Sequence, residues 1–222
     1  DHYRHIPDAA RASLAQVTTA QGPEAARSFL RAALGQGVAE LIVSGRLEAL
    51  PSRIVHHHSK QLQRIASAIA NDADWFDPDS DLLLKDLGLV TLRLYAAAAQ
   101  LLDTRCGIPR SLILREGLAA VPKNLLKFVQ LGGFKPFIQI HTHLSFLDDF
   151  NEEGWNECYR CCADLYRVRP DLLGMYGSSW FYDPVLAGIS PRLDYLREIP
   201  VKGGAQLIFV EEGGEALDNA LS

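Results

Sequence analysis

The chain has 222 residues, of which 48% are hydrophobic and 22% are charged, as in an ordinary globular protein and unlike a disordered one. Its formal net charge of -5 offers no positive field to DNA or RNA, so we expect no nucleic-acid partner. Polar residues interrupt every apolar stretch before the ~18 residues that a membrane helix needs. We also expect a cytoplasmic protein, because no signal-peptide core opens the sequence and three of its four cysteines crowd into one segment.

The first part of the chain, residues 1–131, has the apolar spacing of helices. Apolar residues recur at i, i+3, i+4 and i+7 after Pro23, which predicts a helix closed by Gly35 and Gly37. The same spacing predicts a second helix over about 52–71. Residues 82–102 are apolar almost all round and predict a third, central helix.

The second part, residues 132–222, alternates short apolar runs with helical patterns. Strands are expected at 136–143, 172–182 and 205–210, and helices at about 151–166 and 189–196. Together the two parts predict an α+β fold, in which a helical N-terminal half packs on a small mixed sheet with α/β connections in the C-terminal half. We expect residues 1–131 and 132–222 to form one compact unit.

His141 and His143 are two residues apart at the end of an expected strand, so their side chains project from the same face. Such a pair is suited to a metal site if a carboxylate from residues 148–153, or the histidine run at 56–58, completes it. Alternatively the imidazoles act as a general base, since they titrate near neutral pH. They would otherwise hydrogen-bond locally or face solvent.

Cys158, Cys161 and Cys162 lie with Leu165 on one helical stripe. A Cys-x-x-Cys pair can bind zinc or act in redox chemistry, but this chain has no second pair. Free cysteine is a small hydrophobic residue that favours burial. The stripe therefore predicts three reduced, metal-free core cysteines.

The segment 176–183 combines serines, an aspartate and aromatic residues at an expected strand end, where α/β sheets bind ligands. It does not match the Gly-x-Ser-x-Gly elbow of serine hydrolases, because Phe181 replaces the second glycine. We expect the functional pocket where this segment, the end of the 137–143 strand and the start of the 151–166 helix converge. His141 or His143 would be the base, Glu152 or Glu153 would assist it, and Tyr182 or Tyr195 would be the acid.

The turn at residues 184–192 joins an expected strand end to a helix and contains Gly188, Ser190 and Arg192. It resembles the pyrophosphate loop of GNAT-type N-acyltransferases, over about residues 172–210. The resemblance implies a small-molecule transferase that moves an acyl group from an acyl-CoA-like donor, with those three residues binding the donor. Two other functions stay open: a metal-dependent enzyme with non-haem iron or zinc, and a non-catalytic binding protein. The substrate and the oligomeric state are not specified by these patterns.

Overall fold

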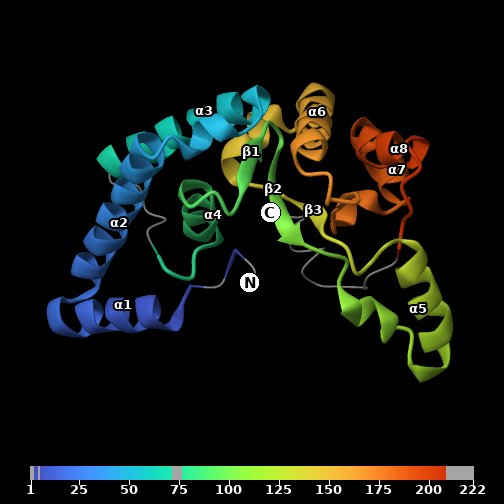
Figure 1. Cartoon of the computed structure of the whole chain (residues 1–222), viewed down its shortest axis with the longest axis horizontal. Coiled ribbons are helices and arrows are strands. Elements are labelled where there is room, and N and C mark those ends of the chain that lie inside the picture. Colours follow the sequence, from blue (N-terminus) through green and yellow to red (C-terminus); the bar gives the residue numbers. More distant parts are fainter. Residues whose placement is uncertain (1–2, 5, 72–76, 209–222) are drawn as a thin grey trace.

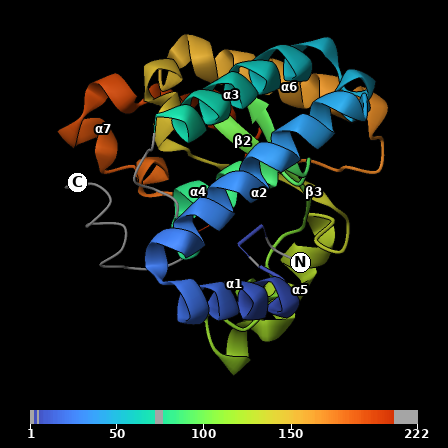
Figure 2. The same cartoon turned by 90° about the vertical axis from the view of Figure 1, so that its left-hand side faces the viewer.

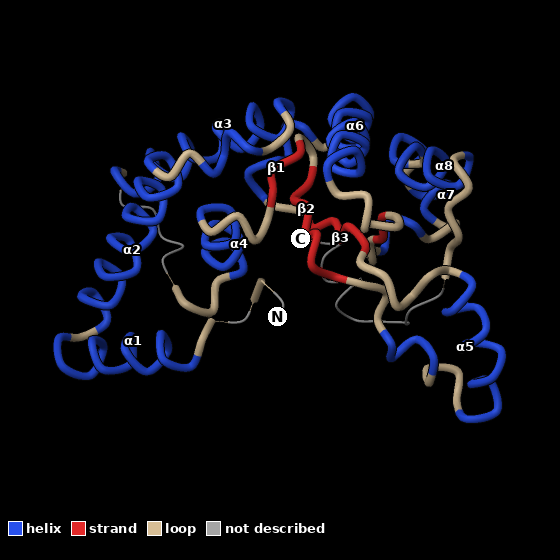
Figure 3. The backbone as a smooth tube through the Cα atoms, in the orientation of Figure 1, coloured by secondary structure: helices blue, strands red, loops and turns tan. Residues whose placement is uncertain are grey.

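A four-stranded mixed sheet lies at the centre of the molecule, with helices on both sides of it (Figures 1 and 3). The computed structural model describes residues 3–4, 6–71 and 77–208. The strands are β1 (Tyr95–Ala97), β2 (Gln100–Cys106), β3 (Phe137–His141) and β4 (Met175–Tyr176), in the order β1-β2-β3-β4. The predicted α+β fold is confirmed.

The longer helices of the described chain are α1 (Asp8–Gln21), α2 (Pro23–Val43), α3 (Ser52–Ala70), α4 (Asp81–Val90), α5 (Val121–Gln130), α6 (Glu152–Val168) and α8 (Tyr195–Lys202). Shorter turns of helix are η1 (Arg46–Ala49), η2 (Arg110–Ile113), η3 (Leu118–Ala120), η4 (Leu144–Asp149), η5 (Trp180–Tyr182), α7 (Leu186–Ile189) and η6 (Pro191–Leu193). Figure 2 shows α2 passing between α1 and α3. No described helix combines the length and the apolar character that crossing a membrane requires.

The strand register gives the sheet two distinct faces. Leu101 lies opposite His141, and Leu102 lies opposite Ile140 in the antiparallel β2–β3 pair. Leu101 belongs to the hydrophobic core formed with α2 and α4, whereas Leu102 and Ile140 belong to the core formed with α6. We call these the α4 face and the α6 face. Helix α6 also makes the crossover between β3 and β4, which are parallel and cannot be joined by a tight turn.

The single helix predicted over 82–102 is wrong beyond Val90. Helix α4 ends there, and the chain turns through Leu92, whose φ is 56°, before the β1–β2 hairpin. Two backbone N–H groups, of Arg93 and Leu94, donate to the carbonyl of Gly88 in this turn. Helix and hairpin are both buried, so the sequence is equally apolar in both and its pattern does not mark the change. Strands β1 and β2 thus precede residue 132, and both halves of the chain build the sheet.

Helix α2 continues past the two glycines that were expected to end it. A Cβ atom on Gly37 would lie 3.0 Å from Val90 Cγ2, so glycine here lets α2 approach α4 closely instead of stopping the helix. The helix predicted over 52–71 is confirmed as α3.

In the C-terminal half the strand at 136–143 and the helix at 151–166 are confirmed as β3 and α6. The Asn151 side chain caps α6 by accepting a hydrogen bond from the Gly154 N–H at 3.0 Å. The strand expected over 172–182 is reduced to β4, and the helix expected over 189–196 is divided among α7, η6 and α8. Residues 205–208 form no strand, and 209–210 lie outside the described residues.

Candidate functional site

His143 is the second residue after the end of β3 and is 2% exposed. Its Nδ1 accepts a hydrogen bond from the Ser145 N–H at 3.0 Å and lies 2.6 Å from Ser145 Oγ. Its Nε2 lies 3.4 Å from Asp86 Oδ1, which is longer than an ordinary hydrogen bond. Because Nδ1 accepts from a backbone N–H, we assign the proton of the neutral ring to Nε2, the nitrogen that faces the carboxylate.

The turn η4 places these groups. It begins directly after His143, so the serine two residues later folds back onto the ring. Phe146 is buried and packs on the imidazole at a ring-centroid distance of 5.4 Å, which anchors the turn. Ser145 itself is exposed, and the flanking Leu144 and Leu147 are 64% and 58% exposed. Ser145 therefore lies at the surface, with its hydroxyl directed at the buried histidine behind it.

Asp86 reaches His143 from α4 and is fully buried. Arg64 of α3 pairs with both of its carboxylate oxygens, with Nη1 at 3.2 Å from Oδ2 and Nη2 on Oδ1. The Arg64 Nε donates to Gln61 Oε1 at 2.6 Å, and Ser145 Oγ lies 3.3 Å from that same oxygen. These five residues form a polar group, here called the His143 cluster, in which hydrogen bonds and ion pairs join all members and the contact between His143 Nε2 and Asp86 is the longest, at 3.4 Å: Gln61, Arg64, Asp86, His143 and Ser145.

The single hydroxyl proton of Ser145 can go to His143 or to Gln61, but only to one at a time. The contact with His143 is 0.7 Å shorter, being 2.6 Å against 3.3 Å, so the hydroxyl is placed to donate to the imidazole. The arrangement is therefore a hydroxyl, a base and a carboxylate in sequence, which is the order needed to activate an oxygen nucleophile.

His141 lies on the α4 face but in a different environment. Its ring meets the ring of Tyr3 edge-on at 4.8 Å, and the Tyr3 hydroxyl donates to Asp81 Oδ1 at 3.0 Å. Lys85 pairs with Asp81 and donates to the Thr142 carbonyl at 2.5 Å. Burial raises the pKa of the Tyr3 hydroxyl, so this phenol stays protonated at neutral pH. His141 thus contacts the N-terminal segment.

Tyr182 and Glu153 are not brought to these histidines. Tyr182 packs against Phe181 at a ring-centroid distance of 4.7 Å, in the core on the α6 face. Its burial raises the pKa of its hydroxyl, which makes it a weaker acid than free tyrosine. Glu153 is exposed in the first turn of α6. The expected convergence of the two histidines with the 176–183 segment is therefore not present in the described structure.

The expected donor turn also belongs to the α6 side, since Leu186 is part of that core. The Gly188 N–H donates to the Val185 carbonyl at 3.1 Å, and the Ser190 N–H donates to the Leu186 carbonyl at 2.7 Å. These two N–H groups are thus engaged within the turn and not turned toward a phosphate. Arg192 is exposed. The role of Gly188, Ser190 and Arg192 in binding an acyl donor stays a prediction.

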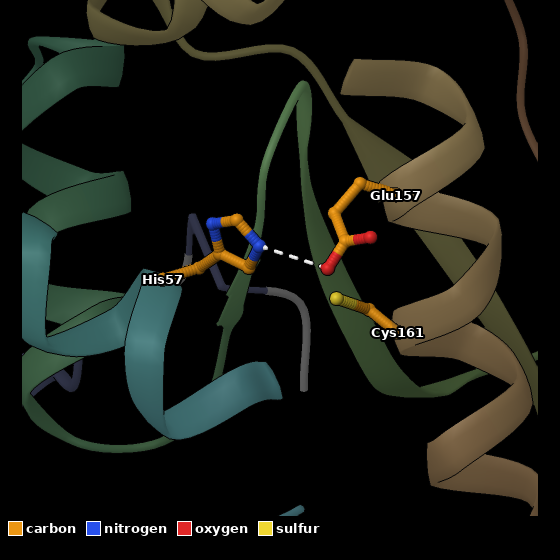
Figure 4. Close-up of side chains that lie close together, drawn as sticks. All are labelled: His57, Glu157 and Cys161. Carbon is orange, nitrogen blue, oxygen red and sulfur yellow. Dashed lines mark ion pairs between the residues drawn. The ribbon is translucent and has the colours of Figure 1, made fainter. Parts of the chain in front are cut away.

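Metal binding by His141 and His143 also lacks geometric support, because both ring nitrogens of His143 already face protein groups. Among the described residues, His57, Glu157 and Cys161 alone offer three ligand atoms within 4.8 Å of one another (Figure 4). The burial of Cys158, Cys161 and Cys162 is confirmed, and all three are free cysteines. Cys161 differs from an ordinary core cysteine, because a histidine and a glutamate side chain lie close to its thiol.

His58, the third of the adjacent histidines, has a structural role. It is fully buried, with Nε2 at 3.1 Å from the Leu89 carbonyl and Nδ1 accepting from the Ala96 N–H at 3.4 Å. It thus links α3 to the end of α4 and to β1. Burial lowers the pKa of His58 to about 4, so the ring is neutral at pH 7.

Sequence reasoning missed Gln61, Arg64, Asp86 and Ser145, four of the five residues of the His143 cluster. Asp86 carried a usable signal, since Lys85 and Asp86 are charged residues inside an otherwise apolar helix. Charged groups in such a place need buried partners. Arg64 and Ser145 lie 22 and 59 residues from Asp86 along the chain, and only the fold brings them to it.

Comparison with known proteins gives no relative from which a role could be transferred, since no family model, curated protein or solved structure matches this chain.

Proposed function

We propose that this protein catalyses acyl transfer at the His143 cluster, with Ser145 as the nucleophile and His143 as the general base. The observation that supports this is the 2.6 Å contact between Ser145 Oγ and His143 Nδ1, with Asp86 at the other ring nitrogen. A serine hydroxyl is a weak nucleophile until an adjacent base takes its proton. Asp86 would hold the ring in the required tautomer and stabilise the imidazolium.

In the proposed reaction, Ser145 Oγ forms a bond to the carbonyl carbon of an activated acyl donor while its proton moves to His143 Nδ1. The bond from the acyl carbon to the leaving sulfur or oxygen then breaks, and the imidazolium returns the proton to that atom. A small-molecule acceptor, or water, attacks the acyl-serine in the same way and regenerates the hydroxyl. The donor class is an acyl-CoA-like thioester or a related ester.

The surroundings of Ser145 support an acyl substrate in two ways. Leu144 and Leu147 are exposed apolar residues of the same short turn η4 as Ser145, and their side chains could contact the hydrocarbon part of an acyl group. The guanidinium of Arg64 contacts the same Gln61 oxygen that Ser145 contacts, so positive charge lies close to the reacting oxygen. Such charge favours the oxyanion that develops during acyl transfer.

The test uses the full chain with acyl-CoA thioesters and p-nitrophenyl esters of increasing chain length. Thiol or phenol release is measured with and without small amine and alcohol acceptors, and intact-mass spectrometry detects the acyl-enzyme. We expect Ser145→Ala to abolish both release and adduct, and His143→Gln to lower the rate by about 10²–10⁴-fold.

Ser178→Ala is the matched control, since Ser178 is an exposed serine in the segment that does not meet His143. We expect it to retain the activity of the parent. The proposal is wrong if the parent releases thiol or phenol from none of the donors faster than buffer alone does. It is also wrong if Ser145→Ala releases them at the same rate as the parent.

A further inference from the structure

His57 on α3 faces Glu157 and Cys161, which are one turn apart on α6 (Figure 4). The side chains of His57 and Glu157 are 13% and 22% exposed, while Cys161 is fully buried. Two helices thus present an imidazole, a carboxylate and a thiol at a site that is largely, but not fully, shielded from solvent. We call this group the His57 cluster.

The spacing of the His57 cluster is close to that of a tetrahedral metal site. With metal–ligand bonds of 2.0–2.1 Å, neighbouring nitrogen and oxygen ligands are about 3.4 Å apart. His57 Nε2 lies 3.5 Å from Glu157 Oε1, and all three ligand atoms lie within 4.8 Å of one another. The distance between His57 Nε2 and Glu157 Oε1 already has the required length, and the distances to Cys161 Sγ would need to shorten by about 1 Å at most.

We propose that the His57 cluster binds one zinc ion through His57 Nε2, a Glu157 carboxylate oxygen and Cys161 Sγ. A mixed nitrogen, oxygen and sulfur set is suited to Zn²⁺, whereas calcium and magnesium take oxygen ligands. A thiolate and a carboxylate balance the two positive charges of the ion. Three protein ligands leave a fourth position for water or an exogenous ligand, as in catalytic zinc sites.

The protein around the cluster also fits this role. Arg53 donates to both Glu157 oxygens, at 2.9 and 3.1 Å, and to Asp164 at 3.1 Å, which fixes the direction of the Glu157 carboxylate. Burial lowers the pKa of His57, so the imidazole is neutral at pH 7, and it offers the lone pair of Nε2 when its proton lies on Nδ1. Binding through Cys161 Sγ requires the thiol to release its proton to solvent as the Zn–S bond forms, and burial, which raises the pKa of this thiol to about 12, adds to the cost of that step.

The experiment measures metal binding and not catalysis, so its result is independent of the acyl-transfer proposal. The full chain, stripped with a chelator under reducing conditions, is titrated with Zn²⁺ against a chromophoric chelator and then with Co²⁺. We expect one Zn²⁺ per chain and a thiolate-to-cobalt charge-transfer band. His57→Gln and Glu157→Gln should each weaken Zn²⁺ binding by at least about tenfold, and Cys161→Ser should also remove the band.

Two controls separate this site from its neighbours. His56→Gln removes an exposed adjacent imidazole, and Cys162→Ala removes a buried thiol of the same helix, and neither residue is in the His57 cluster. Both should bind Zn²⁺ like the parent. Should Cys161→Ser fail to fold, His57→Gln and His56→Gln still decide the question. A parent that binds no stoichiometric Zn²⁺, equal losses in the two histidine variants, or a band that survives in folded Cys161→Ser would overturn the proposal.

Discussion

The two faces of the sheet bury different kinds of side chain. The α4 face buries Lys85, Asp86 and His143, and His58 lies between its helices. The α6 face buries Trp155 and the three cysteines with aliphatic and aromatic neighbours. Apolar packing is tolerant of exchange, whereas each buried charge depends on its own partner. The difference separates the two proposed sites: buried charges on the α4 face hold the His143 cluster, whereas the His57 cluster forms where α3 contacts α6, next to the apolar core of the α6 face.

The largest expected effect on stability comes from removing a buried charge on the α4 face. Replacing Asp86 with alanine leaves the Arg64 guanidinium and the His143 ring without their shared carboxylate. Removing one partner of a buried ion pair costs about 3–5 kcal/mol. We expect that loss in the free energy of unfolding, measured by urea denaturation at pH 7. A loss under about 1 kcal/mol, typical of surface pairs, would show that the pair is solvated in solution.

The second effect is a pH dependence that arises at His58. Its pKa is about 4 in the folded chain and 6.5 in the unfolded one, so the unfolded state takes up a proton first as pH falls. The free energy of unfolding should therefore be highest above pH 6.5 and decrease toward pH 4, by about 3 kcal/mol from this residue.

The measurement is the slope of the unfolding free energy against pH between 6.5 and 4, in the parent and in two variants. His58→Gln should remove the contribution of His58 from that slope. His56→Gln, which replaces an exposed histidine, should keep it. Identical slopes in the parent and His58→Gln would mean that His58 is not buried in the neutral form.

The smallest effect is expected on the apolar face. Cys158 is as fully buried as Asp86, but its thiol serves as a hydrophobic group among Cys162, Leu165 and neighbouring side chains. Cys158→Ala should lower the free energy of unfolding by about 1 kcal/mol, the value for one buried group of that size. If Cys158→Ala and Asp86→Ala destabilise the protein equally, the contrast between the two faces fails.

The apolar pattern along the chain predicted an element correctly where that pattern is typical of one kind of secondary structure only. The apolar stripe of α3 and the glycine-bounded, β-branched run of β3 each match one kind of structure only. The run over 82–102 matches two, because a buried helix and a buried hairpin have the same apolar composition. Similarly, Gly37 reads as a helix end in sequence, although its small size serves the contact with Val90.

The sequence by itself determined the α+β fold class and predicted α3, α6 and β3, and it offered His141 and His143 as candidates, since these depend on residues close together along the chain. Only the tertiary structure decided what His143 contacts. Its partners Asp86, Arg64 and Gln61 come from α4 and α3, and they approach it because those helices pack on one face of the sheet. The same holds for His57 and Cys161, which lie 104 residues apart and meet where α3 contacts α6. The periodicity of apolar residues indicates which side of a helix or strand is buried. A functional site depends on which other helices and strands pack against that side.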